Sequence, residues 1–274
     1  MPDHILNNKS GFDMEIEMNK PRILTKYLFP VMLQIVIIAM IAAVLRNNKI
    51  TIGYGSVIGV VLIVLSGVSS ALWGVLYQCR YNHKSFLGII KDFFNFRQSI
   101  MSYLLVIMFL LIVFGEAVIR KGFQMESMWV PILLFLKALA FGGIEEIGWR
   151  YTFQPVIERM VTYISAVLIT FIFWGIWHFL FFYIDGSLAS INVPFFLLGL
   201  LTNCFILSAL YAYSESLWIC VMTHALINAF SQIVVDDVDG NVIVGIIFKI
   251  LCMVIAVGLY YMVLKQKAQP ELKM

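Results

Sequence analysis

The chain has 274 residues, of which 61% are hydrophobic and only 13% are charged, and its formal net charge is +3. A soluble domain averages about 25% charged residues, so this composition excludes a soluble globular protein and predicts a membrane protein. The small positive charge reflects where the basic residues fall around the apolar segments and gives no reason to expect a nucleic-acid partner.

Eight apolar stretches follow one another along the chain, each close to the roughly 20 residues that a transmembrane helix needs. They cover residues 27–45, 55–78, 101–119, 129–155, 161–183, 192–213, 217–235 and 243–264. The sequence therefore predicts an all-α fold. We expect one eight-helix membrane domain over residues 27–264, with polar tails at 1–26 and 265–274.

The basic residues predict how this domain is oriented, because cytoplasmic loops of membrane proteins are enriched in lysine and arginine. If the N-terminus is inside, 12 lysines and arginines lie in inner segments and 4 lie in outer loops. We therefore expect a multi-pass protein of the plasma membrane with both tails in the cytoplasm. The first tail is too long and too acidic for a signal peptide, so the first span is expected to remain as an anchor.

The fourth stretch carries charges that a bilayer span normally avoids. Residues 142–150 read GGIEEIGWR, which places Glu145, Glu146 and Arg150 where each ionised side chain is costly. Glu146 and Arg150 are four residues apart and are expected to pair on one helix face. Glu145 points elsewhere and has no neighbouring cation. The three could form a buried ion cluster that locks helices together, but an unpaired buried carboxylate is costly, which favours a functional Glu145.

Two later stretches each contain a histidine. His178 lies among aromatic residues in FIFWGIWHFLFF, and His224 precedes Asn228 by four residues, so that imidazole and carboxamide share a helix face. The alternatives are a satisfied core histidine for His178 and a hydrogen bond between helices for the second pair. At 1.5 Å per residue, Glu145 and the two histidines do not lie at one depth, so a common cavity requires tilted or staggered helices.

Together these side chains predict hydrolytic chemistry. A desolvated glutamate can take a proton from water, an imidazole can orient that water, and His224 with Asn228 can bind an oxyanion. Two histidines and a glutamate are also a known catalytic zinc set, so Glu145, His178 and His224 are the alternative metal ligands. Because Asn228 stands where a second histidine ligand would be needed, we expect no cofactor.

Three motifs resemble those of the CPBP family of intramembrane proteases: EEIGWR at 145–150, WGIWH at 174–178 and HALIN at 224–228. This family, also called Abi, includes CAAX proteases and bacteriocin-processing enzymes. Its pattern is EExxxR, then FxxxH, then HxxxN, on a membrane domain of eight helices. The resemblance covers residues from about 130 to 230, which we take as the motif core.

The resemblance implies a role for each motif residue. Glu145 would activate water with His178 as its partner, His224 and Asn228 would form the oxyanion site, and Glu146 with Arg150 would support the structure. Trp174 stands where the family usually has phenylalanine. It remains aromatic on the face of His178, so we expect a changed cavity shape without loss of chemistry.

The function implied is an intramembrane endopeptidase that hydrolyses a peptide bond in a membrane-bound protein or peptide, including lipidated ones. Candidate substrates are CAAX C-termini and bacteriocin or pheromone precursors. The alternative is a non-proteolytic bacteriocin-immunity or scaffold protein with the same fold. A proton-coupled transporter is a third possibility, although the sequence shows no inverted repeat.

Overall fold

The structure is a computed structural model, and it describes residues 22–120, 122–125, 127–234 and 242–268. The described parts of the predicted tails, residues 22–26 and 265–268, are helical. The rest of both tails lies outside the described residues.

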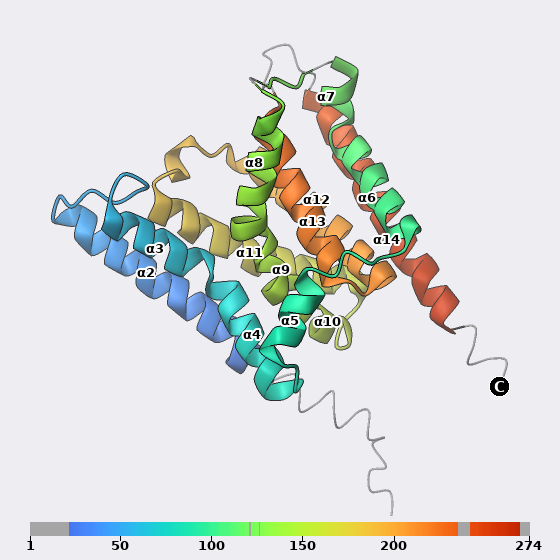
Figure 1. Cartoon of the computed structure of the whole chain (residues 1–274), viewed down its shortest axis with the longest axis horizontal. Helices are drawn as coiled ribbons and strands as arrows, with labels where there is room; N and C mark the ends of the chain where they lie inside the picture. Colours follow the sequence, from blue (N-terminus) through green and yellow to red (C-terminus); the bar gives the residue numbers. More distant parts are fainter. Residues whose placement is uncertain (1–21, 121, 126, 235–241, 269–274) are drawn as a thin grey trace, which may run out of the picture.

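The described chain is a bundle of helices, as predicted (Figure 1). Its only β-type pairing there is an isolated bridge between Phe123 and Val234. The elements are η1 (Leu24–Leu28), α2 (Phe29–Asn47), α3 (Val57–Gly67), α4 (Ser69–Tyr81), α5 (Phe86–Phe93), α6 (Ile100–Val113), α7 (Gly115–Arg120), α8 (Trp129–Ala138), η2 (Leu139–Gly143), α9 (Glu145–Gly148), η3 (Trp149–Phe153), α10 (Gln154–Glu158), α11 (Tyr163–Asp185), η4 (Leu188–Ser190), α12 (Val193–Ser214), α13 (Leu217–Ser231) and α14 (Val242–Ala268).

Several helices begin where a serine, threonine or asparagine side chain accepts a hydrogen bond from the first turn. The hydroxyls of Ser56, Ser85 and Ser99 accept from the backbone N–H three residues on and so cap α3, α5 and α6. Thr162 and Ser216 do the same for α11 and α13. Such caps satisfy donors that have no partner within the helix, which fixes the start of each element.

Each of the eight predicted stretches is mainly helical, but the count of eight membrane spans is not confirmed. By length and composition, four described helices could cross a membrane: residues 24–47, α11, α12 and α14. A fifth span is possible if α3 and α4, which meet at a bend of 42°, act as one. Helices α6 and α13 are apolar but shorter.

The fourth predicted span is a broken helix. Over residues 129–158 the α-helix is interrupted by two π-helical turns, η2 and η3, on either side of α9. π-Helical turns occur mostly as single turns within α-helices, often at functional sites. The one-turn helix α9 begins with the two glutamates of the first motif.

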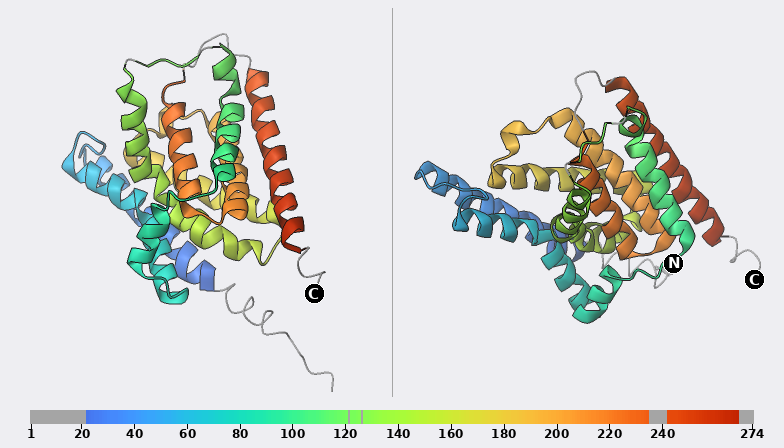
Figure 2. Two further views of the ribbon diagram at one scale, coloured as in Figure 1. Left: turned by 45° about the vertical axis from the view of Figure 1, so that its right-hand side comes forward. Right: turned by 45° about the horizontal axis from the view of Figure 1, so that its top comes forward.

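The arrangement of α11 explains how distant motifs meet. Figure 1 and the right-hand view of Figure 2 show α11 lying across the direction of α13, with α6 and α14 together at the far edge of the bundle. Arg46 of α2 fixes the end of α11, because its guanidinium donates to the carbonyls of Tyr183 and Ile184, the latter at 2.9 Å. Because α11 crosses the direction of α13, Trp174 on α11 contacts both Glu145 and His224.

The core lies where α9, η3, α11, α12 and α13 meet. Trp149, Trp174 and Trp177 are among its largest fully buried side chains, and Arg150 is buried with them. Outer helices such as α14 carry many exposed apolar side chains. An apolar surface of this extent is expected of a protein surrounded by lipid.

Candidate active site

The helix α9 places the two glutamates in the protein interior. Glu145 is 5% exposed and Glu146 is fully buried. The helix can sit this deep because Gly148 has no side chain: a Cβ there would overlap the Tyr27 hydroxyl and the backbone of Ser70. The close packing of α4 against α9 therefore depends on glycine at this position.

Glu146 has two partners, one of which the sequence predicted. Its Oε2 lies 3.5 Å from Nε of Arg150, which confirms the pairing expected from their spacing. Its Oε1 lies 2.7 Å from Nδ1 of His224 on α13. The second contact joins the first and third motifs directly.

Glu145 also has a partner, which the sequence did not predict. The indole N–H of Trp174 on α11 donates to Glu145 Oε2 at 2.7 Å. No salt bridge to Glu145 is found among the described residues, consistent with the expectation that it lacks a cation of its own. A hydrogen bond from a neutral donor satisfies one carboxylate oxygen without neutralising the charge.

Arg150 lies against the same tryptophan. Its Cζ is 4.1 Å from the centroid of the Trp174 ring, and the side chain is fully buried. A desolvated cation over an indole face is worth about 2 kcal/mol or more. Trp174 and Glu146 together hold the guanidinium within the core.

His178 does not contact Glu145 through a hydrogen bond. Its Nδ1 bonds to the carbonyl of Trp174, one turn back, at 2.9 Å. Because a carbonyl only accepts, Nδ1 carries the hydrogen, and Nε2 of the neutral ring is a proton acceptor. The ring is surrounded by Trp174, Trp177, Phe182 and Phe196, with centroids 5.1–5.7 Å away.

His224 and Asn228 face one point, as their spacing predicted. A Cβ at Gly142 would overlap Nδ2 of Asn228 and lie 3.2 Å from Nε2 of His224. The free ring nitrogen of His224 and the amide nitrogen of Asn228 therefore meet beside the η2 backbone. Gly142 precedes the glutamate pair in the sequence, but the spacing of polar residues gave no reason to single it out.

The zinc alternative requires Glu145, His178 and His224 to converge on one metal ion. Among the described residues, no group of three or more His, Cys, Asp or Glu side chains is placed to hold a metal ion. Nδ1 of each histidine is engaged, by Glu146 for His224 and by the Trp174 carbonyl for His178, so any metal would have to bind through Nε2 of the two rings. The described side chains therefore do not form a zinc site.

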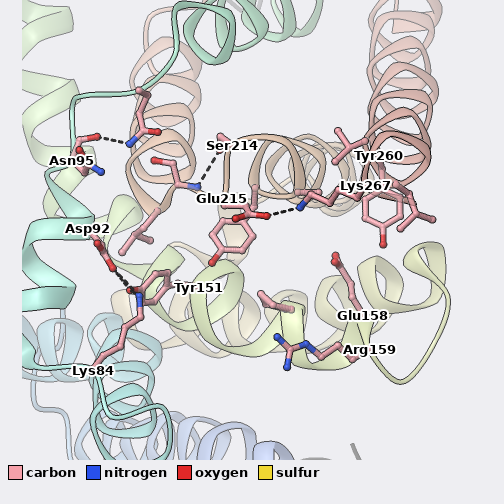
Figure 3. Close-up of a pocket in the computed structure, with 18 residues that line it drawn as sticks. Lys84, Asp92, Asn95, Tyr151, Glu158, Arg159, Ser214, Glu215, Tyr260 and Lys267 are labelled. Carbon is pink, nitrogen blue, oxygen red and sulfur yellow. Dashed lines mark hydrogen bonds and ion pairs between the residues drawn. The ribbon is translucent and has the colours of Figure 1, made fainter. Parts of the chain in front are cut away.

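A second feature lies away from the motifs. A polar cavity of about 720 Å³ is lined by residues of α5, η3 and α10 and by the C-terminal ends of α12 and α14, and none of the predicted catalytic residues lines it (Figure 3). On one side Asp92 binds Lys84 at 2.9 Å and the hydroxyl of Tyr151. Burial alone would raise the pKa of Asp92, but these hydrogen bonds outweigh it and lower the pKa.

The fold and the motif cluster define the class of protein: a polytopic membrane protein with a carboxylate, histidine and asparagine cluster, in which Glu145, Glu146 and His224 are buried. Residues 126–230 match the family described as type II CAAX prenyl endopeptidase, Rce1-like. This segment contains all three motifs, and its match confirms the resemblance to the CPBP family.

A curated relative agrees with the family match. The chain is 28% identical over 144 residues to CAAX prenyl protease 2 of Methanococcus maripaludis. The alignment covers 49% of this chain and 52% of the relative, so the chain spans about half the length of that protein.

Proposed function

We propose that the protein is an intramembrane endopeptidase that removes C-terminal residues from prenylated, membrane-associated CAAX proteins. The observation that carries this proposal is the position of Glu145, a buried carboxylate with one oxygen bound by an indole N–H and no salt bridge found among the described residues. The similarity to a CAAX prenyl protease supports the substrate class.

In the proposed reaction, Glu145 takes a proton from a water molecule, and the water oxygen attacks the scissile carbonyl. The carbonyl oxygen becomes an oxyanion, which His224 Nε2 and Asn228 Nδ2 stabilise by donating hydrogen bonds. The tetrahedral intermediate collapses as the C–N bond breaks, and the proton held by Glu145 passes to the leaving amine. His178 Nε2 accepts a hydrogen bond from the water and orients it.

His224 can donate from Nε2 only in one protonation state. If Glu146 is ionised, the hydrogen on Nδ1 points to its carboxylate, and the neutral ring has a lone pair at Nε2. The oxyanion role therefore requires the doubly protonated ring. The buried carboxylate of Glu146, 2.7 Å away, is the group that stabilises this charge.

The membrane context follows from the same proposal. We place the protein in the plasma membrane with both termini in the cytoplasm, which would expose the substrate's C-terminus to the inner side. The lipid bilayer holds the prenyl group, so enzyme and substrate meet within one membrane.

The test uses full-length protein in proteoliposomes with a farnesylated peptide that ends in a CAAX sequence. Mass spectrometry should detect the released tripeptide with wild type and not with Glu145→Gln. Glu116→Gln, which changes a carboxylate in α7 away from the site, is the control and should retain activity. No release by wild type under these conditions would favour a non-proteolytic immunity or scaffold role.

Two further experiments test whether the substrate must be prenylated and whether activity requires a metal. Equal cleavage of the same peptide without its farnesyl group would contradict prenyl-substrate specificity and favour processing of precursor peptides. Activity should persist after dialysis with 1,10-phenanthroline. Stoichiometric zinc that is lost with activity, and restores it when returned, would overturn the metal-free mechanism.

A further inference from the structure

One side chain contacts every charged or imidazole group of the three motifs except Glu146. Trp174 donates its indole N–H to Glu145 at 2.7 Å, and its ring lies 4.1 Å from Cζ of Arg150. The ring is 5.4 Å from that of His224, at an interplanar angle of 84°, and 5.1 Å from that of His178. Its backbone carbonyl accepts the hydrogen bond from His178 Nδ1.

The indole hydrogen bond makes the two oxygens of Glu145 unequal. Oε2 is held by Trp174, while Oε1 has no hydrogen-bond partner among the residues that the structure describes. The carboxylate cannot rotate about its own axis without breaking the 2.7 Å bond. Oε1 is therefore the oxygen presented to a water molecule.

We propose that Trp174 is a positioning residue, whose N–H fixes the carboxylate of Glu145 for proton transfer. This inference rests on the proposed function. A phenylalanine, which the resembling family usually has at this position, keeps an aromatic ring but has no N–H to donate. This proposal differs from the expectation that an aromatic side chain at 174 affects only cavity shape, and the variants below decide between the two.

The same helix offers a matched control. Trp177 is also buried, at 1% exposure, and donates its N–H to the hydroxyl of Ser69 at 2.8 Å. Trp174→Phe and Trp177→Phe therefore remove the same atoms and one hydrogen bond each from neighbouring turns of α11. They differ in the acceptor, which is the carboxylate of Glu145 or the hydroxyl of Ser69, and in the ring contact with Arg150 that only Trp174 makes.

The experiment measures kcat and KM of both variants in the proteoliposome assay, with thermal unfolding in detergent as the test of folding. A hydrogen bond to a charged group corresponds to about a tenfold to hundredfold effect. We expect Trp174→Phe to lower kcat by that factor with KM nearly unchanged. Trp177→Phe should keep kcat within about threefold of wild type.

If Trp174→Phe does not fold, benzothienylalanine at position 174 provides the second test, because sulfur replaces N–H in a ring of almost the same shape. It should fold like wild type and lose the same factor in kcat. Wild-type kcat in a folded variant lacking the N–H, or equal losses in the 174 and 177 variants, would overturn the inference. Inactive wild-type protein would instead count against the proposed function itself.

Discussion

Oε1 of Glu146 and Nδ1 of His224 lie 2.7 Å apart, although 78 residues separate them in the chain. Both side chains are buried, Glu146 completely and His224 with 3% exposure. The contact fixes the imidazole so that Nε2 faces Gly142 and the amide of Asn228. Glu146, which was expected only to support the structure, therefore also orients the imidazole of His224.

The first prediction concerns the two donors beside Gly142. Removing one donor of an oxyanion site costs about 2.7–4 kcal/mol, a hundredfold to a thousandfold in turnover. We expect Asn228→Ala to lower kcat by about that factor with KM nearly unchanged. Because groups that act as a unit are not additive, the His224→Ala, Asn228→Ala double variant should be little worse than the poorer single variant. Fully multiplicative losses in steady-state kinetics would show that the two act separately.

The second prediction concerns the buried ion pair. Glu146→Gln leaves the guanidinium of Arg150 without its carboxylate, and breaking a buried pair from one side costs about 3–5 kcal/mol. We expect a lower yield of folded protein and a lower unfolding temperature in detergent. Replacing both partners, as in Glu146→Gln with Arg150→Met, should recover part of the loss. An unchanged unfolding temperature for Glu146→Gln would contradict the pairing.

The third prediction concerns the backbone at Gly142. Gly142→Ala places a methyl group on the amide of Asn228, which can move aside at little cost in stability. A donor displaced in this way no longer points at the reacting atom, so kcat should fall about tenfold to a hundredfold. Gly258→Ala in α14, where a Cβ would meet open space, is the control and should retain full activity. Equal activity of the two variants would rule out a close approach at Gly142.

The fourth prediction concerns Glu158, which follows the predicted span and lines the polar cavity (Figure 3). Burial raises its pKa from 4.5 to about 7, although hydrogen bonds from Gln154 and Ser208 act in the opposite direction. Folding therefore favours the protonated carboxyl. The stability that this form contributes is complete below pH 4.5 and is lost as pH rises from 4.5 to about 7.

Glu158→Gln stays neutral and should not lose stability over that window. The unfolding temperatures of the variant and of wild type should match near pH 4.5. Above pH 7 the variant should unfold at a higher temperature, because its free energy of unfolding should be greater by up to about 3 kcal/mol. Thermal unfolding at the two pH values measures this difference. Glu215→Gln, which removes an exposed carboxylate from the same cavity, is the control for the loss of a cavity carboxylate.

The sequence predicted the parts of the site that depend on local spacing. Four-residue intervals correctly placed Glu146 beside Arg150 and gave His224 and Asn228 a common face. The helical class followed from hydropathy alone. These predictions are confirmed because the repeat of the α-helix determines which residues within one helix can contact each other.

The remaining contacts depend on how helices cross, which periodicity does not specify. The bond from Trp174 to Glu145 and the bond from Glu146 to His224 both join separate helices. The depth estimate treated the helices as parallel and straight, whereas α11 lies across the bundle and the glutamates stand between two π-helical turns. The spacing of residues in the sequence predicts neither the crossing of α11 nor the two π-helical turns.

The two π-helical turns also constrain how this chain can change by insertion or deletion. A π-helical turn closes between residues five apart, so it holds one residue more than an α-helical turn. Removing one residue from η2 would restore an ordinary helical turn there and leave α9 on nearly the same face, because five residues of a π turn rotate the chain about as far as four residues of an α-helix. Single-residue deletions within η2 or η3 would therefore leave the two glutamates facing the site, whereas a deletion in a regular α-helical stretch would turn the residues after it by about 100°.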